Sequence, residues 1–208
     1  SSDLDVEYYS TPSLFPKENT PIYHVKNVEV NRKMSDEDKL AWIERIDQII
    51  DSRRDRKGLF FTVSYDRRDF FLKHTRHTDI IFTHGRSDVT QAIEEFKSME
   101  GPGLFISPSV TSGYDFKGDA CRYIIVGKIP YPDTSSMIMQ ARTSSDKDFL
   151  GYVVMNTLVQ EAGRGTRSED DWCEVLILDD TWKWWYPRNQ NFAPNFFKER
   201  VVPFWPGA

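Results

Sequence analysis

The chain has 208 residues, 39% of them hydrophobic, and a formal net charge of -5. This length supports one substantial hydrophobic core, so one domain is the simplest organisation. The acidic balance excludes a protein that holds nucleic acid by bulk positive charge, so any such contact must be local. No apolar run reaches the roughly eighteen residues that a membrane span needs, and the two distant cysteines, Cys121 and Cys173, are typical of a soluble protein of the reducing cytoplasm.

The first predicted elements are an irregular segment and an amphipathic helix. Residues 1–20 form a leading segment in which Pro12 and Pro16 interrupt any helix. Ser35 then begins a capping pattern, and apolar residues recur every three or four positions as far as about Arg54. This pattern predicts a helix that covers one face of a sheet.

Strands and helices alternate along most of the remaining chain. Short apolar runs predict strands at 58–63, 79–83, 103–106, 122–126 and 174–178. Longer periodic segments predict helices at 66–74, 88–99 and 149–164. This alternation is typical of an α/β fold with a mostly parallel central sheet covered on both faces, in which ligands bind at the carboxyl ends of the strands.

Residues 181–208 form a C-terminal extension that is rich in aromatic residues as well as in Pro and Asn. The extension is too aromatic for a free linker, so we expect it to pack on the domain or on a neighbour. Stacking of its tryptophans on nucleobases is a second interpretation. Packing is favoured, because aromatic side chains commonly make buried contacts.

The sequence Gln160-Glu-Ala-Gly163-Arg164-Gly-Thr-Arg167 carries the sharpest chemical pattern. Two arginines three positions apart share a face of a helix, and Gly163 permits close approach of a neighbour. Guanidinium groups neutralise the charge that spreads over the γ-phosphate during phosphoryl transfer. Taken alone, these residues fit equally well a solvated helix end whose arginines pair with the acidic residues that follow.

A second polar segment follows the third predicted strand. Gly113 would let the backbone approach a nucleotide or a nucleic-acid strand, Thr111 could donate a hydroxyl to phosphate, and Asp115 could accept from a ribose hydroxyl or orient an arginine. An ordinary turn is the alternative for this mixture of Ser, Gly and Asp. A phosphate loop is rejected, because Asp119-Ala stands where that motif needs Lys-Ser/Thr.

Taken in order, these segments resemble the C-terminal motor domain of superfamily 2 DNA helicases of the XPD and DinG type, which act in DNA repair. The matching segments are Leu59-Phe-Phe-Thr-Val-Ser64-Tyr65, Thr111-Ser-Gly113-Tyr-Asp115-Phe116 and Gln160 to Arg167 with Leu178-Asp179. The sequence departs from the pattern where Lys128-Ile-Pro-Tyr replaces a commoner Leu-Pro-Phe, and where Thr111 replaces the usual Ser. The resemblance implies a three-layer, RecA-like second helicase domain at 21–180.

The resemblance also implies a role for each matching residue. Arg164 and Arg167 would contact the γ-phosphate of ATP. The nucleotide cleft would be lined by Gln160, Gly113 and Asp115. The DNA strand would be contacted by Ser64, Tyr65, Thr111 and His84. As a lone histidine, His84 fits plain packing even better.

The motifs that are missing define the expected partner. No Gly-x-x-x-x-Gly-Lys-Ser/Thr sequence occurs, and no Asp-Glu-x-His sequence follows a strand. We therefore expect a first RecA-like domain, on the same polypeptide or a split partner, to bind the β- and γ-phosphates of ATP and Mg²⁺. No metal is expected on this chain, because the spacing of His74, His77 and His84 fits no zinc pattern.

The sequence therefore predicts the C-terminal motor half of an ATP-dependent DNA helicase, which needs its first domain and single-stranded DNA and has no membrane partner. The isolated chain is expected to be inactive. One alternative is a non-catalytic RecA-like interaction module, whose arginine face would be covered by a protein. A nuclease is a weaker alternative, because no carboxylate cluster lies at the predicted strand ends.

Overall fold

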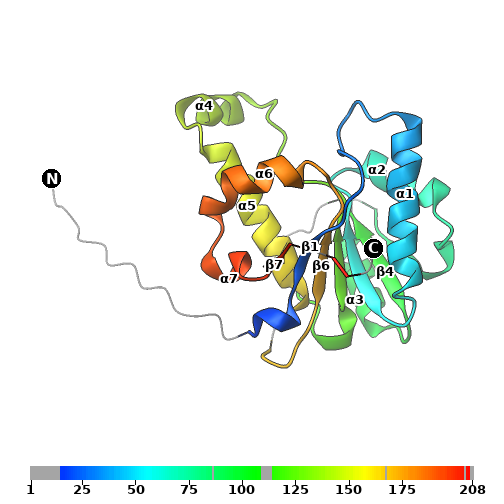
Figure 1. Ribbon diagram of the computed structural model, residues 1–208. Helices are drawn as coiled ribbons and strands as arrows, with labels where there is room; N and C mark the ends of the chain where they lie inside the picture. Colours follow the sequence, from blue (N-terminus) through cyan, green and yellow to red (C-terminus); the bar gives the residue numbers. More distant parts are fainter. Residues whose placement is uncertain (1–14, 86, 109–113, 167, 204, 207–208) are drawn as a thin grey trace.

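The computed structural model describes residues 15–85, 87–108, 114–166, 168–203 and 205–206. Within these ranges the centre of the molecule is a seven-stranded sheet in the order β3-β4-β2-β5-β6-β1-β7 (Figure 1). Every pair of neighbouring strands is parallel. The predicted α/β fold with a mostly parallel sheet is therefore confirmed.

The strands are β1 (Ile22–His24), β2 (Lys57–Phe61), β3 (Ile81–Thr83), β4 (Gly103–Ser107), β5 (Tyr123–Val126), β6 (Glu174–Ile177) and β7 (Val201–Val202). The α-helices are α1 (Asp36–Asp51), α2 (Tyr65–His74), α3 (Val89–Ser98), α4 (Met137–Ser145), α5 (Phe149–Ala162), α6 (Trp182–Asn189) and α7 (Asn195–Lys198). Short 3-10 helices lie at Lys17–Asn19, Thr78–Ile80, Gly118–Ala120, Gly163–Gly165 and Gln190–Phe192. None of the helices in the described ranges is both long and apolar enough to cross a membrane.

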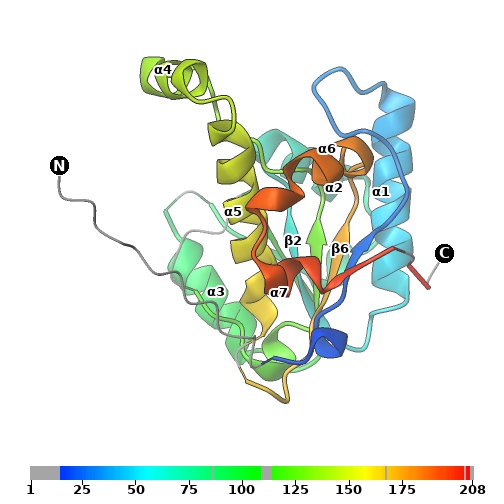
Figure 2. The same cartoon turned by 60° about the vertical axis from the view of Figure 1, so that its left-hand side comes forward.

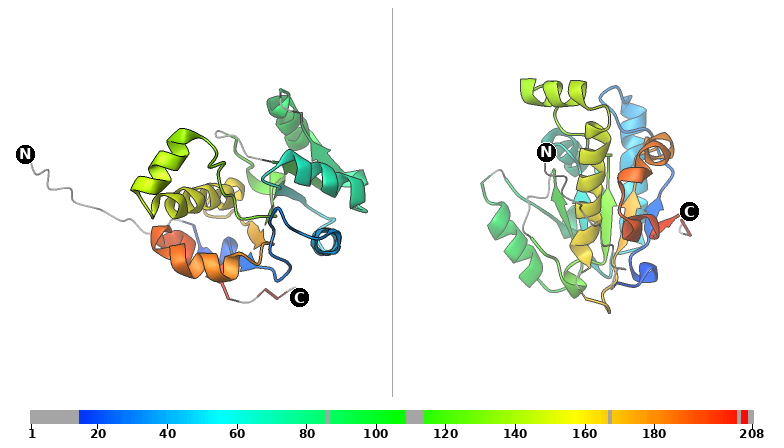
Figure 3. Two further views of the ribbon diagram at one scale, coloured as in Figure 1. Left: turned by 90° about the horizontal axis from the view of Figure 1, so that it is seen from above. Right: turned by 90° about the vertical axis from the view of Figure 1, so that its left-hand side faces the viewer.

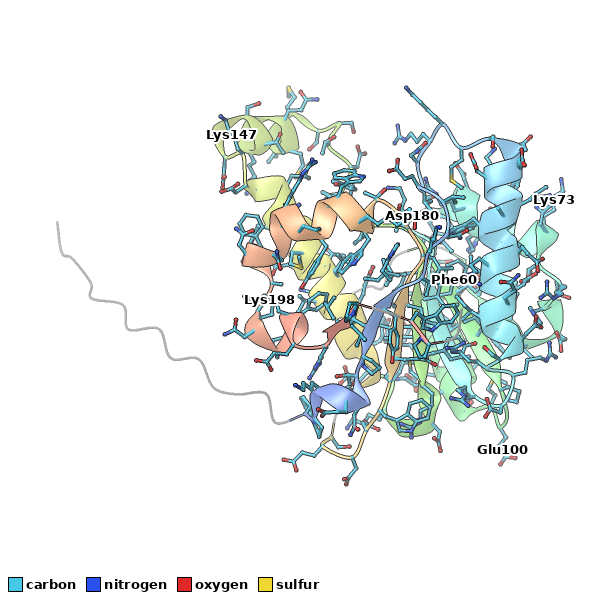
Figure 4. All side chains as sticks on the ribbon, viewed as in Figure 1. Phe60, Lys73, Glu100, Lys147, Asp180 and Lys198 are labelled. Carbon is cyan, nitrogen blue, oxygen red and sulfur yellow. The ribbon has the colours of Figure 1, made fainter. Side chains whose placement is uncertain are left out.

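The side chains of the strands alternate between two hydrophobic layers. On one face, α1 and α2 cover strand residues such as Phe60 and Ile125. On the other face, α3, α5, α6 and α7 cover residues such as Phe61 and Ile124. The sheet lies between these helical layers (Figures 2 and 3), and Phe60 is labelled beside α1 in Figure 4. Two buried faces explain why the strands are continuously apolar in sequence.

The aromatic extension is folded. Trp182 and Trp185 of α6 and Phe197 of α7 are buried in the layer that contains α5. Val201 and Val202 then form β7, which pairs in parallel with β1. These three side chains are therefore packed inside the domain, whereas Trp184 of the same extension is 43% exposed.

Helix α1 is positioned by its first turn and by one buried tryptophan. Ser35 caps the helix: its hydroxyl accepts a hydrogen bond from the backbone N–H of Asp38, 3.1 Å away. The indole N–H of Trp42 donates to the carbonyl oxygen of Gly127, just after β5, at 3.0 Å. A Cβ on Gly127 would lie 2.6 Å from the ring of Phe60, so only glycine permits this close approach.

The carboxylate of Asp179, directly beyond β6, connects three segments at the carboxyl edge of the sheet. Its Oδ1 accepts hydrogen bonds from the backbone N–H groups of Val30 and Thr181, each at 3.0 Å. Its Oδ2 accepts from the N–H of Ile129 at 2.9 Å. The side chain is completely buried. One carboxylate thus fixes the segment before α1, the loop after β5 and the start of α6.

We predict that Asp179→Ala lowers the free energy of unfolding by about 3 kcal/mol, because three backbone amides lose a charged acceptor in a buried site. Urea denaturation followed by circular dichroism measures this loss. Asp170→Ala, on an exposed turn, is the matched control and should change stability by less than about 0.5 kcal/mol. Similar small losses for both variants would contradict the proposed role of Asp179.

Candidate nucleotide and nucleic-acid sites

Helix α5 ends earlier than the sequence pattern predicts. The α-helix stops at Ala162, and Gly163–Gly165 form a short 3-10 helix. Thr166 then has φ -129° and ψ 120°, which is extended backbone. The expectation that Arg164 and Arg167 share one helical face is therefore wrong: the chain has left the helix before position 167, which itself lies outside the described residues.

Arg164 joins the end of α5 to the segment that follows β4. Its Nη1 donates a hydrogen bond to the carbonyl oxygen of Tyr114 at 2.8 Å. Its own carbonyl oxygen accepts from the N–H of Phe116 at 3.4 Å. Arg164 is only 8% exposed, and Phe116 is buried among Phe96 and Phe105. Two segments fifty residues apart are thus held together by this arginine.

Gly165 places this turn near the amino ends of two strands. A Cβ on Gly165 would lie 2.3 Å from Sγ of Cys173 and 3.2 Å from Sγ of Cys121. Cys121 lies two residues before β5 and Cys173 lies directly before β6. Both are buried free thiols, and their sulfur atoms are 3.8 Å apart. The rule that ligands bind at the carboxyl ends of strands would not have located Arg164, which lies toward the opposite end of the sheet.

Glu161 is a buried carboxyl group beside Arg164. Its exposed fraction is 6%. Burial raises the pKa of Glu161 to about 8, an effect that the nearby Arg164 guanidinium partly opposes. The Oε2 atom of Glu161 and the Oγ1 atom of Thr166 are buried and lack a hydrogen-bond partner within the described ranges. The turn that carries Arg164 therefore contains two buried oxygen atoms without a hydrogen-bond partner among the described residues.

Two further residues of the predicted nucleotide cleft lie in described parts of the chain. Gln160 is exposed on the last turn of α5, and Asp115 is exposed between Tyr114 and Phe116, which contact Arg164. Three of the predicted site residues lie outside the described residues: Gly113, Arg167 and Thr111. The structure therefore brings the segments of Arg164 and Asp115 together and places Gln160 one turn before Arg164.

Ser64 and Tyr65 begin α2 at the carboxyl edge, where β2 ends. The hydroxyl of Ser64 caps the helix by accepting from the backbone N–H of Arg67 at 3.3 Å. It also accepts from Nη1 of Arg67 at 3.2 Å. The guanidinium carbon of Arg68 lies 4.7 Å from the ring centroid of Tyr65. The predicted nucleic-acid residues of this segment are thus accompanied by two arginines.

His84 follows β3 at the same edge, but its side chain faces the protein. Its exposed fraction is 7%, and Nε2 lies 2.9 Å from Oγ of Ser107, the last residue of β4. The imidazole stacks on Phe105 with an interplanar angle of 14°. Arg68 donates to the carbonyl oxygen of His84 at 2.6 Å. These contacts pack the imidazole inside the domain. A nucleic-acid strand at this point would meet Arg68 and the loop backbone before the imidazole.

The other histidines of the predicted helix and strand region are engaged in structural contacts. His77 is buried, and its ring nitrogens approach Arg54 at 2.8 Å and the carbonyl oxygen of Asp47 at 3.2 Å. The imidazole of His74 approaches the carbonyl oxygen of Phe70 at 2.8 Å. Across the described ranges, no group of three or more His, Cys, Asp or Glu side chains could hold a metal ion.

The two groups of residues therefore occupy different ends of one domain. Arg164, Gln160 and Asp115 belong to the end of α5 and the segment it contacts, whereas Ser64, Tyr65 and His84 lie where strands end. The segment after β4 starts at the carboxyl edge and reaches Arg164 through Tyr114. The predicted nucleotide residues and the predicted nucleic-acid residues thus lie at opposite ends of one parallel sheet.

The chain belongs to the helicase C-terminal domain family, whose sequence profile matches residues 46–198. Its fold is similar to that of an apo XPD structure, with a TM-score of 0.63 and 18% identity over 84% of this chain and 38% of that chain. It is also similar to Xpd4 of S. tokodaii, with a TM-score of 0.58 and 14% identity over 86% and 37% of the two chains.

Domain 2 of the DEAD-box helicase Mss116p, solved bound to an RNA duplex, has a TM-score of 0.54 and 15% identity over 88% of this chain and 61% of that chain. The two XPD structures are much longer than this chain, which covers 38% and 37% of them. No curated protein sequence matches it. The family match confirms a helicase C-terminal domain, and the solved structures confirm that its fold is RecA-like.

Sequence patterns did not identify several residues that organise these sites. Arg67 and Arg68, which lie in the polar first turn of α2, were not selected from the sequence. A Ser64 cap followed by two arginines is nevertheless a recognisable pattern. Glu161 lies inside the matched motif, but a carboxylate on a mostly apolar helix is the only hint of its burial. Lys128 stood out only as a departure from the family pattern.

We predict that Glu161→Gln stabilises the chain more at pH 8 than at pH 5. The pKa of this carboxyl is 4.5 in its ordinary state and about 8 in the fold. Between these values the unfolded chain releases a proton that the folded chain keeps, so the cost of burying Glu161 is absent at low pH and grows as the pH rises.

Thermal unfolding at both pH values measures the effect, and the difference between the two shifts in Tm should be several degrees. Glu169→Gln, at an exposed position nearby, is the matched control and should give no pH-dependent difference. Equal shifts in Tm for Glu161→Gln at pH 5 and pH 8 would contradict the raised pKa.

Proposed function

We propose that this chain is the C-terminal motor half of an ATP-dependent DNA helicase. In this proposal Arg164 and Arg167 stabilise the γ-phosphate of ATP bound to a first RecA-like domain. The carboxyl edge of the sheet holds one DNA strand. The observation that carries the proposal is the direct bonding of Arg164 to the Tyr114–Phe116 segment, because it joins the two predicted nucleotide motifs in one place.

On the nucleotide side, the residues present suit an anionic group completed by another domain. Arg164 supplies a cation, and Thr166 supplies a buried hydroxyl without a partner in the described part of the chain. Gln160 and Asp115 lie exposed on the two segments that Arg164 joins, so both are accessible to a nucleotide. Arg164 is mostly enclosed by its own domain, and the proposal gives it two roles: it orients the turn after β4, and it adds positive charge to the cleft.

Arg167 follows the extended Thr166 and is the better candidate to reach across to the other domain. ATP bound with Mg²⁺ between the two domains would supply the phosphoryl group that water attacks, and arginines from this chain would neutralise the charge that develops there. Gly113, in the same proposal, lets the backbone approach the nucleotide.

On the nucleic-acid side, Ser64, Tyr65 and Thr111 are proposed to contact the strand, with the loop of His84 beside them. The fold similarity to a helicase domain solved on an RNA duplex supports a nucleic-acid role for this class of domain. A carboxyl edge with hydroxyl groups and local arginines suits phosphate oxygens even on a chain of net charge -5.

Coupling between the two sites follows from the chain itself. The segment after β4 begins at the nucleic-acid edge and is bonded to Arg164 at its other end. We propose that a change in the contacts of Arg164 when the domains close alters the strand-holding edge. Repeated closure and opening would advance the two domains along DNA.

We expect the isolated 208-residue chain to hydrolyse no ATP, because its sequence contains no phosphate loop. A phosphate-release assay with single-stranded DNA measures this. The same assay on Arg167→Lys separates contamination from activity, since a contaminating enzyme is unaffected by the substitution. Turnover by the chain that disappears in Arg167→Lys would contradict the division of labour between two domains.

Within the protein that joins this chain to its first motor domain, we predict that Arg167→Ala lowers ATP turnover by about three to five orders of magnitude with a nearly unchanged KM, as expected for an arginine finger. Arg142→Ala is the control, because that guanidinium lies over the ring of Phe149 on the opposite end of the domain.

A nearly normal turnover of Arg167→Ala would favour the alternative, a non-catalytic interaction module in which these arginines only support the fold. Arg164→Lys adds a second test. If Arg164 only positions the segment of Tyr114, Arg164→Lys should keep the thermal stability that Arg164→Ala loses. The ATP turnover of Arg164→Lys should then stay high.

A further inference from the structure

Three cationic side chains surround the Ser64 end of the carboxyl edge. Arg67 lies in the first turn of α2, Lys128 lies two residues beyond β5, and Arg32 lies in the segment before α1. Together they form what we call the cation cradle, defined as Arg32, Arg67 and Lys128. The cradle is distant in sequence from the arginines of the nucleotide motif.

The fold brings the three cations together through bonds of their immediate neighbours. Strands β2 and β5 are adjacent and in register at Phe61 and Val126, and the N–H of Gly127 donates to the carbonyl oxygen of Phe61 at 3.0 Å. This pairing puts Lys128 beside the start of α2. The Asp179 carboxylate binds the N–H groups of Ile129 and Val30, so it also holds Arg32 on the same side.

None of the three cradle cations makes an ion pair with any residue that the structure describes. Six other arginines make ion pairs with described residues, among them Arg53 with Glu174 at 2.6 Å, Arg56 with Asp55 at 2.7 Å, and Arg122 with Asp119 at 2.8 Å. Among the described residues, the Arg67 side chain donates to the neutral hydroxyl of Ser64, and Nζ of Lys128 donates to the carbonyl oxygen of Ile129 at 3.4 Å.

Mutual repulsion adds to the effect of burial in the cradle. Burial lowers the pKa of Lys128, and the nearby positive charges of Arg67 and Arg32 lower it further, while Asp179 opposes them. Burial likewise lowers the pKa of Arg67; the charge of Asp179 opposes this effect, Arg32 adds to it, and Asp66 opposes it. The carboxylate of Asp179 already accepts three amide hydrogen bonds. An added anion would relieve this repulsion.

Room for a ligand lies beside Arg32. A pocket of about 560 Å³ is lined by two cationic side chains, three acidic ones and four neutral ones: Arg32, Lys33, Glu29, Asp38, Asp180, Asn27, Val28, Asn31 and Met34. This volume is in the range of small-molecule pockets. Nδ2 of Asn27, which lines the pocket, is a buried donor with no acceptor in the described part of the chain. Asp180, labelled at the upper edge of the sheet in Figure 4, is engaged by His24 and Lys183.

We propose that the cation cradle of Arg32, Arg67 and Lys128 binds one phosphodiester group of a single-stranded nucleic acid, with the adjoining nucleotide directed toward the Asn27 pocket. The proposal rests on the proposed nucleic-acid function of this edge and assigns to it residues outside the matched motifs. Phosphodiester oxygens accept from the guanidinium and ammonium donors, and the amide of Asn27 donates to a base or sugar oxygen.

Lys128 lies outside the matched segments, so in this proposal the cradle adds a phosphate contact to those expected from Ser64, Tyr65 and Thr111. A phosphate contact also has a signature that a packing role lacks, because displaced counterions make binding depend on salt concentration.

The test is fluorescence anisotropy of a labelled oligothymidylate single strand, titrated with the 208-residue chain at several salt concentrations. For the double variant Arg32→Gln, Lys128→Gln we expect affinity to fall about tenfold. We also expect the slope of log affinity against log salt to become shallower by about 0.7, the value for one lost phosphate on a single strand. Arg67→Gln should weaken binding in the same direction.

Two control variants remove the same charges elsewhere. Lys73→Gln lies at the far end of α2, on the periphery in Figure 4, and Arg188→Gln lies beside Trp184 on α6. Together they should leave both affinity and slope unchanged. Circular dichroism melting shows that each variant is folded.

The outcomes distinguish failure of the cation cradle from failure of the proposed nucleic-acid function. If the wild-type chain binds the strand but the double variant keeps its affinity and slope, the cradle is refuted and the nucleic-acid function stands. If the double variant loses affinity no more than the control pair does, the effect is one of net charge and the cradle is again refuted. If the wild-type chain binds no strand at low salt, both proposals fail.

Discussion

The buried carboxylate of Asp179 holds the carboxyl edge of this domain together. Three backbone amides from three separate loops converge on its two oxygens, and the cations of the cradle lie around the same point. A charge can be buried at such a site because hydrogen bonds replace its hydration. The edge proposed to hold nucleic acid is therefore organised by an anion that the nucleic acid itself never contacts.

This arrangement explains how an acidic chain can belong to a family of nucleic-acid motors. Six arginines are paired with described carboxylates, so these arginines contribute little positive potential outside the protein. Positive charge is left available at a few places near strand ends. A local charge of this kind favours a strand in one position and leaves the remainder of the surface unattractive to nucleic acid.

The sequence predicted the fold well, because alternation of apolar strands and periodic helices is a local property. It missed β1 and β7, which have three and two residues and gain stability from parallel neighbours rather than from their own pattern. It also extended α5 too far: Gly163 was interpreted as a site of close approach, whereas a glycine at this place ends the helix. The Asp179 hub and the cradle depend on contacts between distant segments, which no local pattern reports.

The packing of Gly165 against Cys121 and Cys173 has a consequence for how the motor moves. Both sulfur atoms would overlap or crowd a side chain at this position, and both belong to segments anchored by central strands. The turn that carries Arg164 therefore cannot slide along the sheet as a flexible loop does. Under the proposed function, a change in the distance between this arginine and a first motor domain would therefore involve movement of the two domains relative to each other.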